Sequence, residues 1–278
     1  MKTALVACEK HDGLDALFAA TRLLVDRFQC YVEGAATITG FTEIAAMAPA
    51  GAAPVLLEMP DDSKDVSELR DAFTAAMRSG GITEAGPSRS GASFTWRNDG
   101  SLNDFAFAAR ARIFDISILA RPVSGQPRPR MGLLEATLFE SGGPLLIVPP
   151  VVPQSLGERI IIGWNGSTET TRIINFSMPI LARAKEIMVL TVDDGSLIGP
   201  PGHMLASHLD AHGFNVSHKM VTQPGGNAGP TILAEAKEFG ADTVIKGAYT
   251  TSRLRQMIFG GATSHILWNA DLPILMAH

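Results

Sequence analysis

Glycine residues near the end of this chain are spaced as in a loop that holds a phosphate group. In residues 242–264, DTVIKGAYTTSRLRQMIFGGATS, an apolar strand-like run stops at Gly247, and Gly260 and Gly261 then open a second apolar segment. Glycines let the backbone turn tightly and bring its N–H groups near anionic oxygens, and the N-terminus of a following helix adds partial positive charge. The chemistry expected here is binding of a phosphate-bearing ligand.

The spacing of these residues resembles the nucleotide-binding signature of the universal stress protein family. That signature is a glycine, two residues, a second glycine, nine residues, a third glycine, and then serine or threonine. Gly247 and Gly260 match the first and third glycines, whereas Thr250 stands at the second and Gly261 stands at the hydroxyl position. Thr263 or Ser264 could place a hydroxyl nearby. An ordinary strand-to-helix connection is the other interpretation of the same stretch.

The resemblance implies an adenine nucleotide, ATP with Mg²⁺, held at the carboxyl ends of the strands. In family members that hold ATP, an acidic residue that closes the first strand meets the adenosine, and Asn165 occupies that position here. Its amide keeps a donor and an acceptor but lacks the charge. Residues 165–167 can also be a plain turn in which Ser167 caps a helix. The full set expected to face the nucleotide is Gly163, Asn165, Val192, Lys246, Gly247, Thr250, Gly260, Gly261, Ala262 and Thr263.

The N-terminal half lacks this glycine pattern. Arg121 and Pro122 occur where the first glycines are needed, and proline removes an N–H donor and stiffens the turn. We therefore expect this half to bind no nucleotide and to serve as a packing partner. An anion site formed by Arg121, Arg128 and Arg130 is the other hypothesis for this segment.

The elements that must position these residues alternate between strand and helix in the C-terminal half. Short apolar runs rich in β-branched residues indicate strands, and apolar residues at spacings of three and four indicate helices. The expected strands are 159–164, 186–194, 215–222, 242–248 and 272–278, and the expected helices are 168–184, 204–213, 232–240 and 263–270. Such alternation predicts a parallel sheet covered by helices on both faces.

The N-terminal half repeats the plan. Residues 3–9 predict a strand, and a helix is expected after a capping Asp12, with its apolar stripe formed by Leu14, Leu17, Phe18, Thr21, Leu24, Val25 and Phe28. Asp115 corresponds to Asp242 and Pro144 to Pro273 at nearly equal separations, which indicates duplication. The first strands are further apart, so an insertion is expected near residues 39–80, with a helix in its later part.

Two domains are therefore expected, 1–150 and 151–278, joined by a proline-stiffened linker. With the family resemblance, the expected fold is two doubly wound five-stranded parallel-sheet domains of the α/β class, Rossmann-like and similar to the adenine nucleotide alpha hydrolases. In single-domain members subunits associate through their last strands. Residues 145–150 and 273–278 are expected to do so within this chain, which would give a tandem pseudo-dimer.

The bulk composition narrows the function. The chain has 278 residues, of which 46% are hydrophobic and 18% are charged, so it can bury substantial cores. The net charge is −5, with acidic residues in excess in both halves, so no basic stripe for nucleic acid is present. Cys8 and Cys30 are expected to be buried, reduced thiols. No apolar run is long enough for a signal peptide or a membrane span, so a cytoplasmic location is expected.

No catalytic motif stands out. His208 and His212 could share a helical face and bind a metal, but a solvated polar face is the favoured interpretation. The expected function is therefore that of a stress-response protein that binds an adenine nucleotide, with slow or absent hydrolysis. A pair of stress domains without ligand, acting through self-association or protein partners, is the second hypothesis. An enzyme for a small anionic metabolite is the third.

Overall fold

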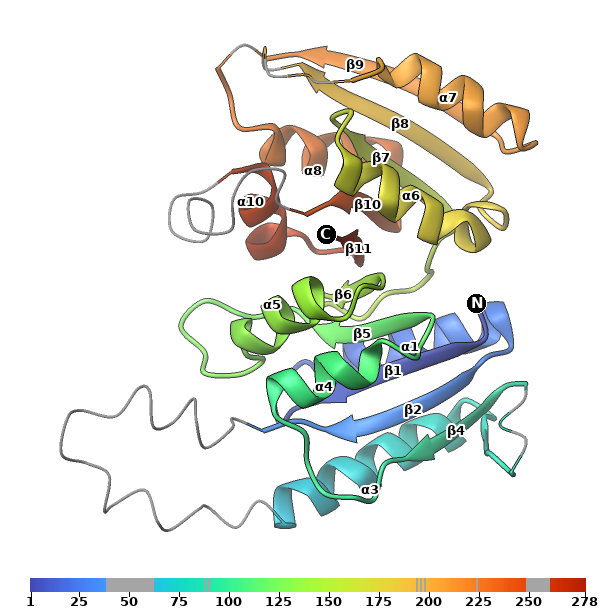
Figure 1. Cartoon of the computed structure of the whole chain (residues 1–278), viewed down its shortest axis with the longest axis vertical. Coiled ribbons are helices and arrows are strands. Elements are labelled where there is room, and N and C mark those ends of the chain that lie inside the picture. Colours follow the sequence, from blue (N-terminus) through green and yellow to red (C-terminus); the bar gives the residue numbers. More distant parts are fainter. Residues whose placement is uncertain are drawn as a thin grey trace, which may run out of the picture.

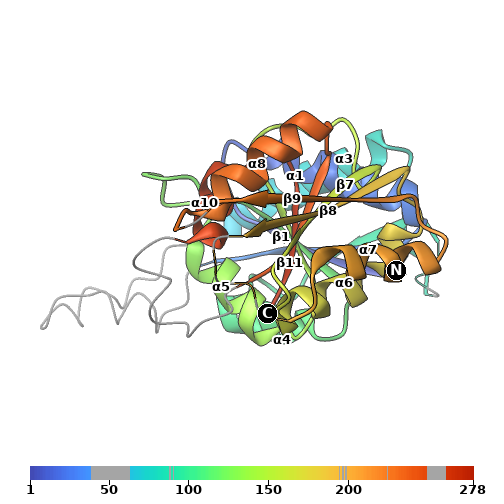
Figure 2. The same ribbon diagram turned by 90° about the horizontal axis from the view of Figure 1, so that it is seen from above.

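One twisted sheet of eleven strands runs through the computed structural model. The structure describes residues 1–38, 63–87, 89, 91–193, 195, 197, 199–223, 225–248 and 261–278. The strand order is β3-β4-β2-β1-β5-β6-β11-β10-β7-β8-β9 (Figure 1). Every neighbouring pair is parallel except β6 and β11, which are antiparallel. Seen from above, the strands fan out about the long axis of the molecule (Figure 2), as the natural twist of strands requires.

The two halves of the sheet share one topology. Apart from the short edge strand β3, each half has its first strand in the middle and its fourth and fifth strands toward the junction. The N-terminal elements are β1 (Thr3–Cys8), α1 (Leu14–Phe28), β2 (Tyr31–Ala36), α3 (Ser63–Ser79), β3 (Thr83–Glu84), β4 (Ser93–Trp96), α4 (Asp104–Ala111), β5 (Ile116–Ala120), α5 (Met131–Glu140) and β6 (Leu145–Val148). The C-terminal elements are β7 (Arg159–Trp164), α6 (Thr168–Leu181), β8 (Glu186–Asp193), α7 (Gly202–Ala211), β9 (Val216–Thr222), α8 (Ala228–Phe239), β10 (Thr243–Gly247), α10 (Ala262–Asn269) and β11 (Ile274–Ala277). The doubly wound α/β fold expected from the sequence is confirmed.

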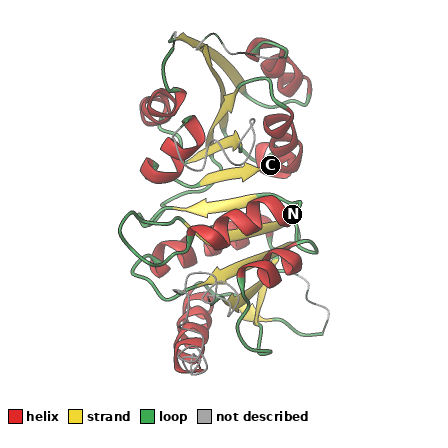
Figure 3. Ribbon diagram, turned by 60° about the vertical axis from the view of Figure 1, so that its left-hand side comes forward, coloured by secondary structure: helices red, strands yellow, loops and turns green. Residues whose placement is uncertain are grey.

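Helices cover both faces of the sheet, with strands between them (Figure 3). Buried side chains of α1, α3, α6 and α7 form one apolar cluster with the strands, and those of α4, α5, α8 and α10 form another on the opposite face. The central strands are therefore buried on both sides, which explains their continuous apolar runs. None of the helices among the described residues is long and apolar enough to cross a membrane.

The antiparallel pairing of β6 with β11 joins the halves. Ile274 lies opposite Ile147, and Met276 lies opposite Leu145, all of them buried. The expected internal pairing of the last strands is thus confirmed. A second contact lies at the ends of α1 and α6, where Arg27 donates to the carbonyls of Gly157 and Arg183.

Details of the N-terminal half differ from the sequence expectation. The apolar stripe of α1 is buried as expected. The helix begins at Leu14, however, and its N-cap is Gly13 without a side-chain hydrogen bond, so the expected Asp12 cap is wrong.

In the region of the expected insertion, helix α3 follows β2 and precedes β4 in the chain, as α7 follows β8 and precedes β9. Residues 39–62 are outside the described residues. Cys8 and Cys30 are buried free thiols, as expected, and burial raises the pKa of Cys30 to about 11.

Gly34 in β2 makes room for an aromatic cluster. A Cβ atom at this position would lie 2.7 Å from the Phe73 ring of α3. That ring is fully buried and meets Phe18, Phe94 and Trp96 at centroid distances of 5.7 to 5.8 Å, so it has little freedom to move aside.

We therefore predict that Gly34→Ala lowers the free energy of unfolding by about 1–3 kcal/mol, measured by urea denaturation. In the Phe73→Leu background the same change should cost at least about 1 kcal/mol less, because the clashing ring is gone. Gly86→Ala is the control, since a Cβ there meets nothing within 4 Å. Equal costs of Gly34→Ala in both backgrounds would contradict this explanation.

Candidate nucleotide site in the C-terminal half

The candidate site lies where β7 and β10 end and α10 begins. The two strands are parallel neighbours, with Lys246 opposite Gly163, so their carboxyl ends meet at one edge of the sheet. On the other side β7 pairs with β8, and the chain connections leave β7 in both directions. Ligands of open α/β sheets bind at such switch points.

Lys246 is a buried cation at the centre of this edge. It is 8% exposed, and its ammonium donates to the carbonyl of Gly247 at 3.1 Å and to the Thr263 hydroxyl at 3.0 Å. Within the part of the chain that the structure describes, Lys246 forms no ion pair. Burial lowers the pKa of Lys246 to about 8, and the more distant charge of Glu169 only partly opposes this. The amine therefore stays charged at neutral pH, but at a cost in free energy.

The first turn of α10 brings a second source of positive potential to the same place. Ala262 and Thr263 begin the helix, and its N-cap, Gly261, has no side chain to accept from the free N–H groups. A Cβ at Gly261 would meet nothing within 4 Å among the described atoms, so none of the described residues crowds this position. A helix N-terminus beside an uncompensated lysine is an electrostatic arrangement that favours an anion.

Asn165 is held by its own turn. Its side-chain oxygen accepts from the backbone N–H of Ser167 at 3.2 Å and from the Thr170 hydroxyl at 2.7 Å. Ser167 caps α6, since its hydroxyl accepts from the N–H of Thr170 at 3.2 Å. The interpretation of residues 165–167 as a turn and helix cap is confirmed.

Two glycines of the expected site serve close packing. A Cβ at Gly247 would lie 2.4 Å from the backbone nitrogen of Thr170, so the glycine is required by the approach of α6. A Cβ at Gly163 would lie 3.2 Å from Ile232 of α8, a tight contact, and at an ordinary 3.7 Å from Cγ of Lys246, so Gly163 leaves room for Ile232. Val192 is also buried, in the apolar cluster that contains Ile232.

The structure thus brings part of the expected set together. Lys246, Gly247 and Thr263 are in direct contact, and Gly163 lies beneath the lysine. Thr250 and Gly260 lie outside the described residues.

Sequence reasoning missed two parts of the surroundings. Thr170 links Asn165 to α6, and no motif marks it. The loop before α7 covers the Asn165 turn: the indole N–H of Trp164 donates to the carbonyl of Pro200 at 2.9 Å, and a Cβ at Gly199 would lie 2.6 Å from the carbonyl oxygen of Gly166. The glycines and prolines of this loop were the available signal.

The N-terminal half fills the equivalent place with its own charges. Glu9 follows β1 as Asn165 follows β7, and it is 2% exposed. Its carboxylate accepts from the backbone N–H of Arg130, the N-cap residue of α5, at 3.0 Å, and from Nε of Arg130 at 2.6 Å. Arg130 also pairs with Asp104 at 2.7 Å. An internal carboxylate therefore occupies the helix N-terminus, which gives a physical reason to expect no nucleotide here.

The arginines proposed for an anion site in this half are dispersed. Arg128 lies 4.0 Å from Asp65, and Arg121 donates to the carbonyls of Leu267 and Trp268 at the end of α10. With Arg130 bound to Glu9, the three guanidinium groups do not form one cluster.

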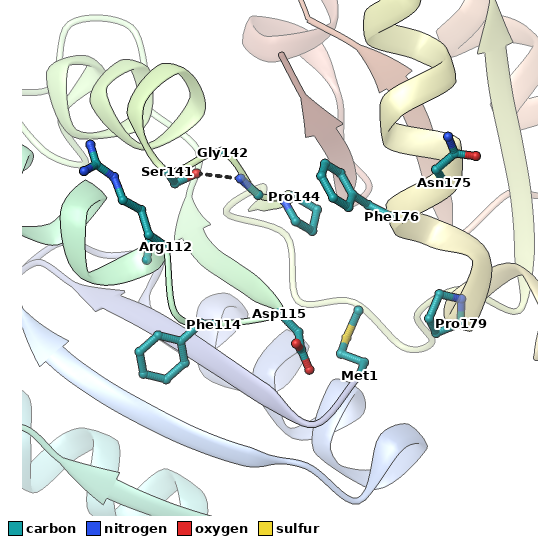
Figure 4. Close-up of a pocket in the computed structure, with 12 residues that line it drawn as sticks. Met1, Arg112, Phe114, Asp115, Ser141, Gly142, Pro144, Asn175, Phe176 and Pro179 are labelled. Carbon is teal, nitrogen blue, oxygen red and sulfur yellow. Dashed lines mark hydrogen bonds between the residues drawn. The ribbon is translucent and has the colours of Figure 1, made fainter.

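A cavity of about 440 Å³ lies at the amino ends of β1, β5 and β6, against α6 (Figure 4). Arg112 and Asp115 line one side, and Phe176 and Pro179 of α6 line the other. The Ser141–Gly143 turn between α5 and β6 forms part of its wall, as the expected helix-to-strand connection.

Comparisons with known proteins bear on the family and the fold of the chain. Residues 158–278 match the model of the universal stress protein family. The C-terminal half is therefore similar in sequence to universal stress protein domains. A search of curated proteins found no match.

Solved universal stress proteins share the fold of the entire chain. One from Archaeoglobus fulgidus DSM 4304 superposes with a TM-score of 0.70 at 14% identity, covering 99% of this chain and 95% of that one. A putative universal stress protein from Pseudomonas aeruginosa UCBPP-PA14 has a TM-score of 0.57 at 14% identity, covering 100% and 93%. At this identity the likeness shows the fold alone, and it extends over the N-terminal half as well.

The buried lysine of the C-terminal half leads to a stability prediction. Because its pKa in the folded state lies below the ordinary value of 10.5, charged Lys246 destabilises the fold by about 3 kcal/mol at pH values below 8. We predict that Lys246→Met raises the free energy of unfolding by about 1–3 kcal/mol at pH 7, measured by urea denaturation.

The sign of the pH dependence follows from the same pKa. Between pH 8 and pH 10.5 the unfolded chain binds the Lys246 proton more tightly than the folded chain does. The free energy of unfolding of the wild type therefore rises over this range relative to that of Lys246→Met, and the difference between the two proteins shrinks. Lys219→Met is the control, since Lys219 is a half-exposed lysine paired with Glu235. A Lys246→Met variant that is less stable than wild type at pH 7 would contradict the electrostatic argument.

Proposed function

We propose that this chain is a universal stress protein that binds an adenine nucleotide, ATP with Mg²⁺, in its C-terminal half and acts in a stress response in the cytoplasm. The observation that carries the proposal is the buried ammonium of Lys246, which has no ion-pair partner among the described residues and lies beside the N-terminus of α10. A bound phosphate would supply the missing negative charge.

Each group would have a definite part in binding. Lys246 would pair with phosphate oxygens, and the N–H groups of Ala262 and Thr263 would donate to them. Asn165 and Val192 are proposed to face the adenosine, where the amide of Asn165 offers hydrogen bonds. Among the described residues no cluster of three His, Cys, Asp or Glu side chains could hold a metal ion, so Mg²⁺ would enter on the phosphates.

The proposed consequence of binding is a switch. A nucleotide at this edge would fix the start of α10 and change the surface shown to partners. Hydrolysis is proposed to be slow or absent.

The second candidate is a ligand-free domain pair that acts through self-association or protein partners. Two observations favour it: the space at Gly247 is taken by α6, and the side-chain oxygen of Asn165 is already used within its turn. The edge strand β9 also exposes Met220, 58% accessible, to a partner.

Calorimetric titration with MgATP distinguishes the two candidates. We predict saturable binding by the wild type and at least about tenfold weaker binding by Lys246→Met, which lacks the charge. Thr263→Asp should abolish binding while the protein remains folded, because its carboxylate would pair with Lys246 as Glu9 pairs with Arg130 in the N-terminal half.

Lys219→Met serves again as the control and should bind like the wild type. Circular dichroism and thermal unfolding verify that each variant is folded. No binding by folded wild-type protein would favour the ligand-free candidate, and undiminished binding by Lys246→Met would refute the role of the lysine.

A further inference from the structure

A second cavity, of about 340 Å³, lies at the carboxyl ends of β5 and β6 and beside the start of α1. Arg121, His11, Asp12 and Gln126 provide its polar lining. Apolar atoms come from Ala120, Val148 and Pro150, among others. The paired Glu9 and Arg130 do not line it, and neither does any residue of the proposed nucleotide site.

Arg121 brings a buried positive charge to this cavity. The residue is 8% exposed, and one of its terminal nitrogens donates to the carbonyls of Leu267 and Trp268. Its Nε is buried and has no hydrogen-bond partner among the described residues, and no ion pair of Arg121 is found among them. Burial lowers the pKa of Arg121, and the charge of Asp271 acts against this only from a distance. A buried guanidinium without a counter-ion is costly unless an anion joins it.

His11 adds a second unsatisfied donor. Its Nδ1 accepts from the backbone N–H of Gly13 at 2.9 Å, which places the proton of the neutral ring on Nε2. Burial lowers the pKa of His11, so the neutral form is favoured. Nε2 is buried and has no hydrogen-bond partner among the described residues.

The remaining lining limits the charge of a ligand. Asp12 is exposed and lines the same cavity, so a second negative charge on the ligand would be repelled. The apolar walls suit a hydrocarbon body better than a hydrated ion. The volume suits a small molecule rather than a peptide or a nucleotide.

We propose that this cavity binds a small organic monoanion, a carboxylate carried by an apolar body. The carboxylate would accept from Arg121 and from the Nε2–H of His11, and the body would lie against Ala120, Val148 and Pro150. This site is separate from the proposed nucleotide site and does not depend on it.

The test uses the full chain and benzoate as the probe, in saturation-transfer NMR and calorimetry. We expect saturable binding with a Kd on the order of 1 mM or tighter. Arg121→Gln should weaken binding at least about tenfold, and His11→Phe at least about threefold, because each removes a donor. Arg128→Gln is the matched control from the same segment and should leave binding unchanged, since Arg128 does not line the cavity.

Arg121 also holds the end of α10, so thermal unfolding must show that Arg121→Gln is folded, and His11→Phe provides a variant without that second contact. Inorganic phosphate is the comparison ligand and should bind more weakly than benzoate. The proposal is overturned by absence of saturable benzoate binding to the wild type, by unchanged binding in both variants, or by phosphate that binds as tightly as benzoate.

Discussion

The antiparallel pairing of β6 with β11 is the contact on which the arrangement of the whole molecule depends. It joins two parallel sheets into one. Because the pairing is antiparallel, the strands of the two halves point in opposite directions, so their carboxyl ends lie on opposite sides of the molecule. Each last helix then ends beside the strand ends of the other half. Arg121, after β5, meets the end of α10, and Phe139, near the end of α5, meets the C-terminal His278, whose ring centroid lies 4.8 Å away. These contacts tie the halves together outside the sheet, in addition to that of Arg27 with the carbonyl of Arg183.

The two halves differ in the charged residues that lie at the ends of their first and fourth strands. In each half a helix start lies near the end of a parallel strand: Arg130 at the start of α5 contacts Glu9 after β1, and Thr263 in the first turn of α10 contacts Lys246 of β10. In the N-terminal half the carboxylate of Glu9 accepts from the backbone N–H of Arg130 at the start of α5 and from its side chain, so this cation is paired within the chain. In the C-terminal half the uncharged Asn165 takes the place of Glu9, and Lys246 adds a positive charge that no described side chain compensates by an ion pair. The two halves thus share one topology and differ in the charged residues that follow their first and fourth strands.

Helix α10 connects the regions of interest. Its first turn contacts Lys246 through Thr263, and its last carbonyls accept from Arg121. Because the helix spans only Ala262–Asn269, groups that bind at either end act on the same short rigid element. Positive charge at its C-terminal end is favourable to the helix dipole, whereas positive charge at its N-terminal end is not. The last carbonyls of the helix thus give Arg121 favourable partners, whereas at the first turn burial lowers the pKa of Lys246 to about 8.

Most of the fold could be predicted from the sequence. The alternation of apolar runs and helical stripes determined the order of strands and helices, since periodicity is a local property. The match of Asp115 with Asp242 and of Pro144 with Pro273 indicated the duplication, and the apolar last strands indicated their pairing. The start of α1 was the exception, because a cap depends on backbone geometry at Gly13 that residue type does not reveal.

The sequence also placed Lys246, Gly247 and Thr263 in one loop-and-helix segment, but it could not say what each one does. Only the tertiary structure showed that Gly247 is small to admit α6 and that a side chain at Gly163 would press on Ile232 of α8. The pairing of Glu9 with Arg130, and the cavity beside Arg121, join residues far apart in the chain. Sequence patterns record which residues alternate along a strand or a helix, whereas charge balance and cavity lining arise from residues that come together only when the sheet closes.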